Sequence, residues 1–174
     1  TIAVVTNIDS EHMDYYGNFD NLRAAFTRFV ENIPFYGFAA LCIDDAEVQA
    51  MIPRVSDRKI VTYGRSPQAD VRMTRLNYID DGSSFDVIIS DRSLGSERHL
   101  SDLQLPMVGA HNALNALAVI SVACEMGLSD KVIKKALAGF EGVKRRFTRT
   151  GEVDGVSIID DYGHHPVEIV AVLQ

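Results

Sequence analysis

The segment Ile158-Ile159-Asp160-Asp161-Tyr162-Gly163-His164-His165-Pro166 joins an apolar run to a cluster of titratable side chains. The apolar residues predict a strand, and Pro166 is expected to keep the chain from continuing as a helix. Ligand sites in open α/β sheets gather at the carboxyl ends of strands, where this cluster would lie. A polar turn that happens to be rich in histidine is the structural alternative. The segment therefore favours an α/β fold with a binding site at this strand end.

The composition of the chain is that of an ordinary soluble globular protein. Of its 174 residues, 47% are hydrophobic and 24% are charged, which is enough for one sizeable core or for one core and part of a second. The formal net charge of −7 argues against a nucleic-acid or membrane partner, because both favour basic patches. Cys42 and Cys124 lack metal-ligand spacing, which favours reduced thiols in a cytoplasmic protein.

Strands and helices are expected to alternate along the first part of the chain. The expected strands are residues 1–8, 38–43 and 59–63, and a helix is expected over residues 19–32. A second, short helix should begin after the capping pair Asp44-Asp45, run through Met51 and end at Pro53. From Asp70 to Leu105, short alternating stretches surround an Asp80-Asp81-Gly82 turn. This pattern predicts a small antiparallel β subregion.

Two helices and a strand pair are expected after Pro106. The helices cover residues 110–126 and 129–140, with Gly127 capping the first, and the strands cover residues 151–153 and 156–159. We place a domain boundary near residues 143–148. The chain opens directly in a strand and stops in an amphipathic segment, so we expect an internal fragment of a longer protein.

Two clusters in the first 116 residues could carry chemistry. Residues 6–14 read Thr-Asn-Ile-Asp-Ser-Glu-His-Met-Asp, in which His12 among carboxylates could ligate a divalent cation or bond to a phosphate. A solvated acidic loop with a capping histidine explains the same residues. Residues 109–116 place Asn112 and Asn115 on one helix face, where side-chain amides match the edge of adenine. Solvent-facing or capping asparagines are the structural alternative.

Two further clusters lie near the expected domain boundary. Lys144-Arg145-Arg146-Phe147 could bind a phosphate or tie two domains together, although a surface basic run is the simpler explanation. In the segment that follows, Asp160 or Asp161 could accept ribose hydroxyls, and His164 or His165 could meet a second substrate.

These stretches, taken in order, resemble the Mur ligases. The stretches that carry the resemblance are Thr6–Asp14, Ile33–Gly37 (Ile-Pro-Phe-Tyr-Gly), His111–Ala116, Arg145–Phe147 and Asp160–Pro166. They span nearly the whole chain. Within the family, the Pro-Phe-Tyr-Gly stretch and the Tyr162-Gly163 pair resemble the members that add L-alanine to UDP-N-acetylmuramate.

The resemblance implies a three-domain ATP-dependent enzyme with Mg²⁺. Residues 1–143 would form most of the central ATP-binding domain, which is a P-loop-type mixed sheet with helices, and residues 144–174 would begin a Rossmann-like C-terminal ligase domain. ATP would phosphorylate the substrate carboxylate, and the amine of L-alanine would attack the acyl phosphate to leave an amide. Positioning and charge neutralisation matter more in such a reaction than a protein nucleophile.

The resemblance also implies roles for individual residues. His12 matches a magnesium ligand of the family. A catalytic segment would face the acceptor substrate and the incoming amino acid. The nucleotide contacts implied are His111, Asn112, Asn115, Arg146 and Asp161, and the catalytic segment comprises Tyr162, His164 and His165.

The sequence also departs from the family pattern. No lysine is followed by serine or threonine, so the Gly-Lys-Thr/Ser phosphate loop is absent, and no lysine precedes Lys59 to serve as a carboxylated second-metal ligand. We therefore expect this chain alone to lack ligase activity. A sibling ligase that attaches a recycled murein peptide to the same UDP-sugar is one alternative. A non-catalytic nucleotide- or metal-binding module is the other. Neither the oligomeric state nor the separate roles of the histidines follow from the sequence.

Overall fold

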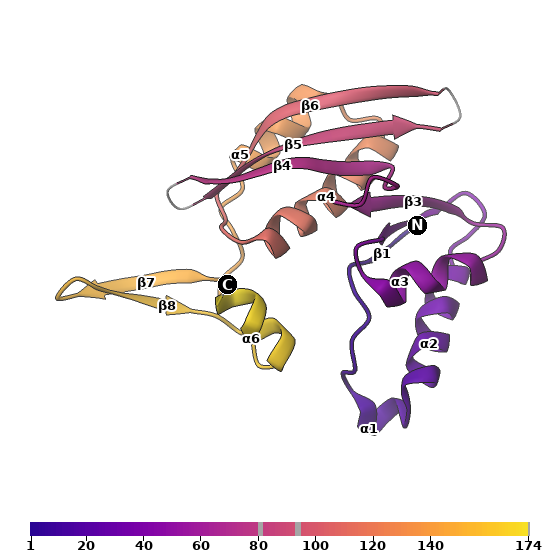
Figure 1. The fold of residues 1–174 in the computed structure, drawn as a ribbon, viewed down its shortest axis with the longest axis horizontal. Coiled ribbons are helices and arrows are strands. Elements are labelled where there is room, and N and C mark those ends of the chain that lie inside the picture. The colour runs from indigo at the N-terminus through magenta and orange to yellow at the C-terminus, as the bar shows by residue number, and fades with distance from the viewer. Residues whose placement is uncertain (80–81, 93–94, 174) are drawn as a thin grey trace.

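The computed structural model describes residues 1–79, 82–92 and 95–173 (Figure 1). Among them, six strands form one sheet in sequence order: β1 (Ile2–Val5), β2 (Phe38–Cys42), β3 (Lys59–Gly64), β4 (Val71–Ile79), β5 (Gly82–Asp91) and β6 (Ser96–Leu105). The helices and one 3₁₀ turn are α1 (Met13–Tyr16), α2 (Phe19–Glu31), α3 (Ala46–Met51), η1 (Ile52–Arg54), α4 (Ala110–Glu125), α5 (Asp130–Ala138) and α6 (Pro166–Leu173).

The sheet is parallel from β1 to β4 and antiparallel from β4 to β6. This mixed arrangement confirms the predicted fold class. The antiparallel strands are longer than the short stretches expected, and they continue the parallel sheet because β4 pairs with β3 at Tyr63 and Val71. Asp80 and Asp81 of the predicted turn lie outside the described residues, and Gly82 begins β5.

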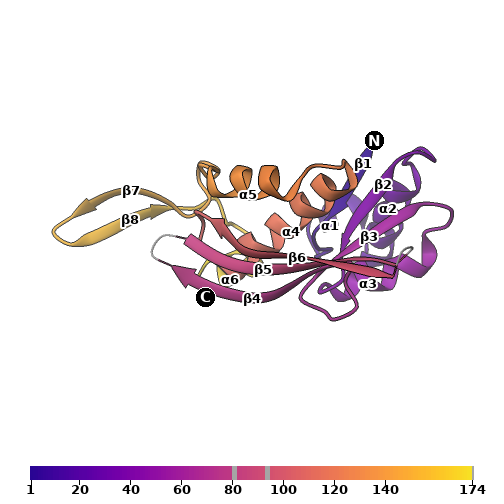
Figure 2. The same ribbon diagram turned by 90° about the horizontal axis from the view of Figure 1, so that it is seen from above.

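The all-apolar strand β2 separates two cores. Phe38, Ala40 and Cys42 face the larger core, which β3–β6 form with α4 and α5. Ala39 and Leu41 face the smaller one, which α2 and α3 cover together with β1. A strand buried on both faces is typical of a parallel sheet, whose helices cover both sides. Figure 2 shows α4 and α5 along one face of the sheet.

Local side-chain bonds set the helix boundaries. The Asn18 side chain accepts from the Asn21 amide at the start of α2, and the Asp45 side chain accepts from the Val48 amide at the start of α3. Of the predicted cap pair Asp44-Asp45, Asp45 therefore caps α3. The Asp44 carboxylate instead accepts hydrogen bonds from the Arg65 and Ser66 amides. Among the described residues no helix is long and apolar enough to cross a membrane.

The last part of the chain forms a separate hairpin and helix. Strands β7 (Thr148–Val153) and β8 (Val156–Asp160) pair antiparallel, and the hairpin projects away from the larger sheet (Figure 2). The expectation that Pro166 keeps the chain out of a helix is wrong, because Pro166 is the first residue of α6. The missing N–H of proline is harmless there, since the first amides of a helix have no partner within it.

Candidate functional site

Helix α4 places three predicted nucleotide contacts beside the sheet. Its buried residues pack on β2–β6; they include Ala113, Ala116, Leu117 and Ile120. His111, Asn112 and Asn115 line a cavity on another side of the helix. The spacing that buries one side of the helix therefore sets these polar side chains in a row along the cavity.

The cavity has a volume of about 730 Å³ and is lined by α4, α5, α6, the end of β6, the loop after β1 and the segments on both sides of the β7–β8 hairpin. Its polar lining consists of Thr6, Asn7, His111, Asn112, Asn115, Arg146, Asp161 and Glu168. All five predicted nucleotide contacts are among these residues, although they come from distant parts of the chain. Much of the remaining wall is apolar and includes Val119, Val132 and Phe140. Such a lining suits a flat heterocycle with a polar edge.

The carboxylate of Asp161 ties the two ends of the hairpin together. Its Oδ2 accepts from the Phe147 amide at 2.8 Å and its Oδ1 accepts from the Gly163 amide at 2.7 Å. Burial by itself would raise the pKa of Asp161, but these two amide bonds, the charge of Arg146 and, at the acid pH where Asp161 titrates, the charge of His111 outweigh it, so the pKa lies below its ordinary value. Asp161 is therefore ionised at neutral pH and fixes the cavity wall.

We expect His111 to be neutral at pH 7. Burial lowers its pKa below the ordinary 6.5, Arg146 lowers it further, and Asp161 opposes the shift. The unfolded chain binds this proton near pH 6.5 and the folded chain binds it only at lower pH. Stability should therefore fall as the pH drops from above 6.5 through the folded pKa. An NMR titration should give a midpoint below 6.5 for His111, and Asp161→Asn should lower it further; a midpoint at or above 6.5 contradicts this account.

The two asparagines are not equivalent. The Asn112 side-chain amide donates to the Val108 carbonyl at 2.8 Å, so it also braces the first turn of α4. Asn115 makes no side-chain hydrogen bond within the described residues and is exposed. Asn115 is therefore the side chain with both its donor and its acceptor available to a ligand.

Replacing Gly109 with alanine should disturb the cavity through His111. Gly109 precedes α4 with a φ of 99°, and a Cβ there would lie 2.6 Å from Cε1 of the His111 ring. The backbone strain should cost about 1–3 kcal/mol, measured by chemical unfolding. Gly127→Ala is the matched control, because Gly127 has a φ of 74° and open space for a Cβ. Both variants should lose stability, and only Gly109→Ala should shift the His111 NMR signals; an equal shift in both contradicts the steric argument.

The predicted catalytic segment does not line the cavity but follows Asp161 at its edge. The Tyr162 ring lies 4.7 Å from the Arg145 guanidinium and packs edge-on against the His164 ring. His164 is exposed, and its Nδ1 lies 3.1 Å from the Tyr162 carbonyl. His165 turns away from both, toward the loop that follows β1. The structure thus gives the two histidines different surroundings.

Sequence reasoning missed Glu168. Its Oε2 accepts from the His164 and His165 amides at 3.1 and 3.3 Å, which lowers its pKa, and its Oε1 lies 3.8 Å from Arg146 Nη1. A glutamate three residues after a helix cap commonly bonds back to the cap. The spacing of His165 and Glu168 fits this pattern. It was not recognised because Pro166 was expected to prevent a helix at this position.

His12 occupies the N-terminal cap of α1, with a left-handed φ of 54°. The described residues contain no group of three or more His, Cys, Asp or Glu side chains that could hold a metal ion. A Mg²⁺ ion at His12 would need phosphate oxygens, water or other protein ligands to complete its coordination.

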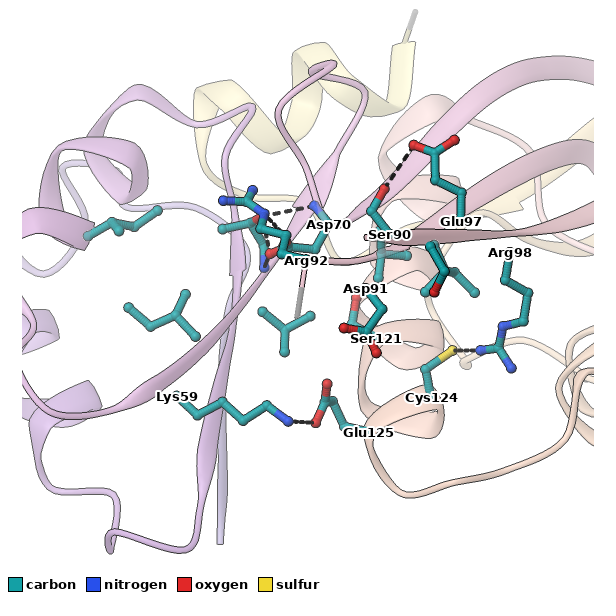
Figure 3. A pocket seen from close by; sticks show the side chains of 17 residues that line it. Lys59, Asp70, Ser90, Asp91, Arg92, Glu97, Arg98, Ser121, Cys124 and Glu125 are labelled. Carbon is teal, nitrogen blue, oxygen red and sulfur yellow. Dashed lines mark hydrogen bonds and ion pairs between the residues drawn. The ribbon is translucent and has the colours of Figure 1, made fainter. Parts of the chain in front are cut away.

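A second cavity of similar volume lies near the C-terminal end of α4 and shares no lining residue with the first (Figure 3). Its charged side chains are largely paired with one another or with neighbours. Lys59 pairs with Glu125, Arg92 Nε lies 2.5 Å from Asp70 Oδ1, and Ser90 donates to Glu97. Arg98 Nη2 lies 3.0 Å from the sulfur of Cys124, and both cysteines are free among the described residues. These pairings make it a poorer ligand site than the first cavity.

Comparison with known proteins identifies a family. Residues 1–123 match the Mur ligase middle domain. The chain is 60% identical over its full length to the UDP-N-acetylmuramate–L-alanine ligase of Rhodospirillum rubrum and 62% identical to that of Paramagnetospirillum magneticum. It spans only 36% and 37% of the length of these two relatives.

Solved structures show the same fold. The chain matches MurF from Acinetobacter baumannii with a TM-score of 0.81 at 23% identity, covering 98% of this chain and 36% of that one. It matches the UDP-N-acetylmuramate–alanine ligase from Thermotoga maritima with a TM-score of 0.74 at 26% identity, covering 99% of this chain and 37% of that one. The six-stranded mixed sheet and the middle-domain match agree with the resemblance drawn from the motifs, and the chain belongs to the Mur ligase family.

Proposed function

We propose that this chain is part of an ATP-dependent ligase that joins L-alanine to UDP-N-acetylmuramate in cytoplasmic peptidoglycan precursor synthesis. One observation carries the proposal: the five residues expected to contact the nucleotide line a single cavity, although they lie between positions 111 and 161. Identity of about 60% to L-alanine-adding ligases over the full chain supports the choice of amino acid. The proposal concerns the complete parent protein, since the relatives are longer.

The cavity residues divide into base, phosphate and ribose contacts. We assign the adenine edge to Asn115, with Asn112 and the neutral ring of His111 beside it. Arg146 would bind phosphate, because a guanidinium matches paired phosphate oxygens. Asp161 would accept ribose hydroxyls with the lone pairs that its two amide bonds leave unused.

ATP would supply the phosphoryl group that converts the substrate carboxylate into an acyl phosphate, and L-alanine would then displace phosphate. The residues of this chain contribute positioning to that reaction. His12 would help hold Mg²⁺ near the phosphates, with ligands from outside the described residues. We assign Tyr162 and the exposed His164 to the acceptor side, next to the nucleotide cavity. In this proposal, residues 1–143 belong to the central domain and residues 144–174 begin the C-terminal domain.

The test is phosphate release by the parent protein with ATP, Mg²⁺ and UDP-N-acetylmuramate. Release that depends on L-alanine supports the proposal. Release that depends on the murein tripeptide instead would move the assignment to the recycling ligase while keeping the nucleotide site. No release with either amine donor would contradict both ligase assignments and favour a binding module. The present chain alone should release no phosphate above background.

A further inference from the structure

His165 is the less exposed of the two adjacent histidines and faces a different part of the fold. Its side chain is 25% exposed, compared with 69% for His164. Its Nδ1 atom lies 3.6 Å from Asp9 Oδ2 and 3.7 Å from Glu11 Oε1. That nitrogen is buried and has no hydrogen-bond partner among the described residues. This buried ring nitrogen therefore places the segment before α6 directly against the two carboxylates of the loop after β1.

The carboxylates that face His165 are held by their own loop. Asp9 Oδ1 accepts from the Ser10 amide at 2.7 Å, which leaves Oδ2 directed to His165, and the Glu11 amide donates to the Asp9 carbonyl at 2.7 Å. The loop follows β1, whereas His165 lies directly before α6, so the contact joins opposite ends of the chain. In Figure 1 the loop after β1 and the start of α6 face each other below the sheet.

The contact of His165 with the Asp9–Glu11 loop also affects the residues next to His165 in the chain. The His165 amide bonds to Glu168, and Glu168 also holds the His164 amide. Fixing the His165 ring therefore restrains the backbone that carries His164 and Tyr162. Among the described residues, the His165 ring is the basic group that lies within 4 Å of the Asp9 and Glu11 carboxylates.

We infer that His165 is a positioning residue. Its ring holds the segment before α6 against the Asp9–Glu11 loop, and this contact keeps His164 and Tyr162 at the edge of the nucleotide cavity, with His164 left open to substrate. The structural part of the inference stands on the geometry alone. Its consequence for catalysis rests on the proposed function.

Amide hydrogen exchange of this chain tests the structural part without any activity. His165→Ala and the double variant Asp9→Asn/Glu11→Gln should each speed exchange of the amides of residues 164–170 by about tenfold. Combining all three changes should add little, because each removes the same contact. Asp14→Asn is the matched control, since Asp14 lies in the same region and forms no ion pair within the described residues. Unchanged exchange in the double variant, or effects that multiply in the combined variant, would overturn the inference.

Kinetics of the parent ligase test the catalytic part. His165→Ala should lower kcat about tenfold and leave the KM for ATP within about twofold, because His165 does not line the nucleotide cavity. His165→Asn should recover most of the rate, since asparagine keeps a donor near the position of Nδ1, whereas His165→Gln should not. Equal rates for the Asn and Gln variants would overturn the positioning role. If the parent shows no ligase activity, the proposed function fails, and the exchange experiment still decides whether the contact exists.

Discussion

Asp161→Ala in the parent ligase should lower kcat/KM for ATP by about 100-fold or more. The Asp161 carboxylate accepts two backbone amide bonds, from Phe147 and Gly163, and lines the cavity between them. A hydrogen bond to a charged group contributes roughly 1.5–3 kcal/mol, and about 1.4 kcal/mol corresponds to a factor of ten. Losing both bonds would release Arg146 and the start of the catalytic segment from their positions.

Asp160→Ala is the control for this experiment. Asp160 is the adjacent carboxylate, but it does not line the cavity, and its nearest described cation is Arg145 at 3.8 Å. The control should stay within about threefold of the unmodified enzyme, and Asp161→Asn should fall between the control and the alanine variant. Similar losses at both positions would show that the carboxylate bonds of Asp161 have no special role. A loss of kcat/KM for ATP in the Asp160 variant alone would assign the nucleotide-site carboxylate to Asp160 instead of Asp161.

Phe85→Ala should destabilise this chain by about 3–5 kcal/mol, the usual range for removing a buried aromatic ring. Phe85 on β5 is 0% exposed and belongs to the core on which α4 packs, together with Leu117. The ring therefore belongs to the same core as the buried side of α4, the helix that carries Asn112 and Asn115. Urea unfolding measures the change, provided that the slope with denaturant stays constant.

Phe35→Ala makes the same chemical change on the surface. Phe35 is 89% exposed and contacts the Tyr36 ring, so its removal should change stability by no more than about 0.5 kcal/mol. A loss below about 1.5 kcal/mol for Phe85→Ala, or equal losses for the two variants, would contradict the packing described for the larger core.

Local patterns predicted most of the elements. The helices α2, α4 and α5 lie within a residue or two of their expected positions, because their apolar residues recur at helical spacing and their ends carry polar or glycine caps. The strand boundaries were predicted less accurately, because a strand ends where its hydrogen-bonded neighbour in the sheet ends. Residues 6–8 leave the sheet because β2 pairs only with residues 2–5 of β1.

Long-range contacts explain what the sequence did not predict. The partner of His165 lies in the loop after β1, and nothing near residue 165 indicates it. Local propensity also failed at Pro166, where a proline compatible with the first position of a helix was interpreted as a barrier to one. By contrast, the motifs had already singled out Asn112, Asn115, Arg146 and Asp161, which line one cavity. The two asparagines lie in the first turns of α4, whose start the sequence predicted, and Arg146 and Asp161 flank the β7–β8 hairpin.

Photolabelling of the parent protein with an azido-adenine analogue of ATP tests the nucleotide site most directly. Peptide analysis should locate the label in residues 107–119 or 143–163, excess ATP should prevent it, and Asn115→Ala should weaken it. Label in residues 59–62, 89–92 or 96–98, which line the second cavity, would contradict the account, as would label that ATP does not displace.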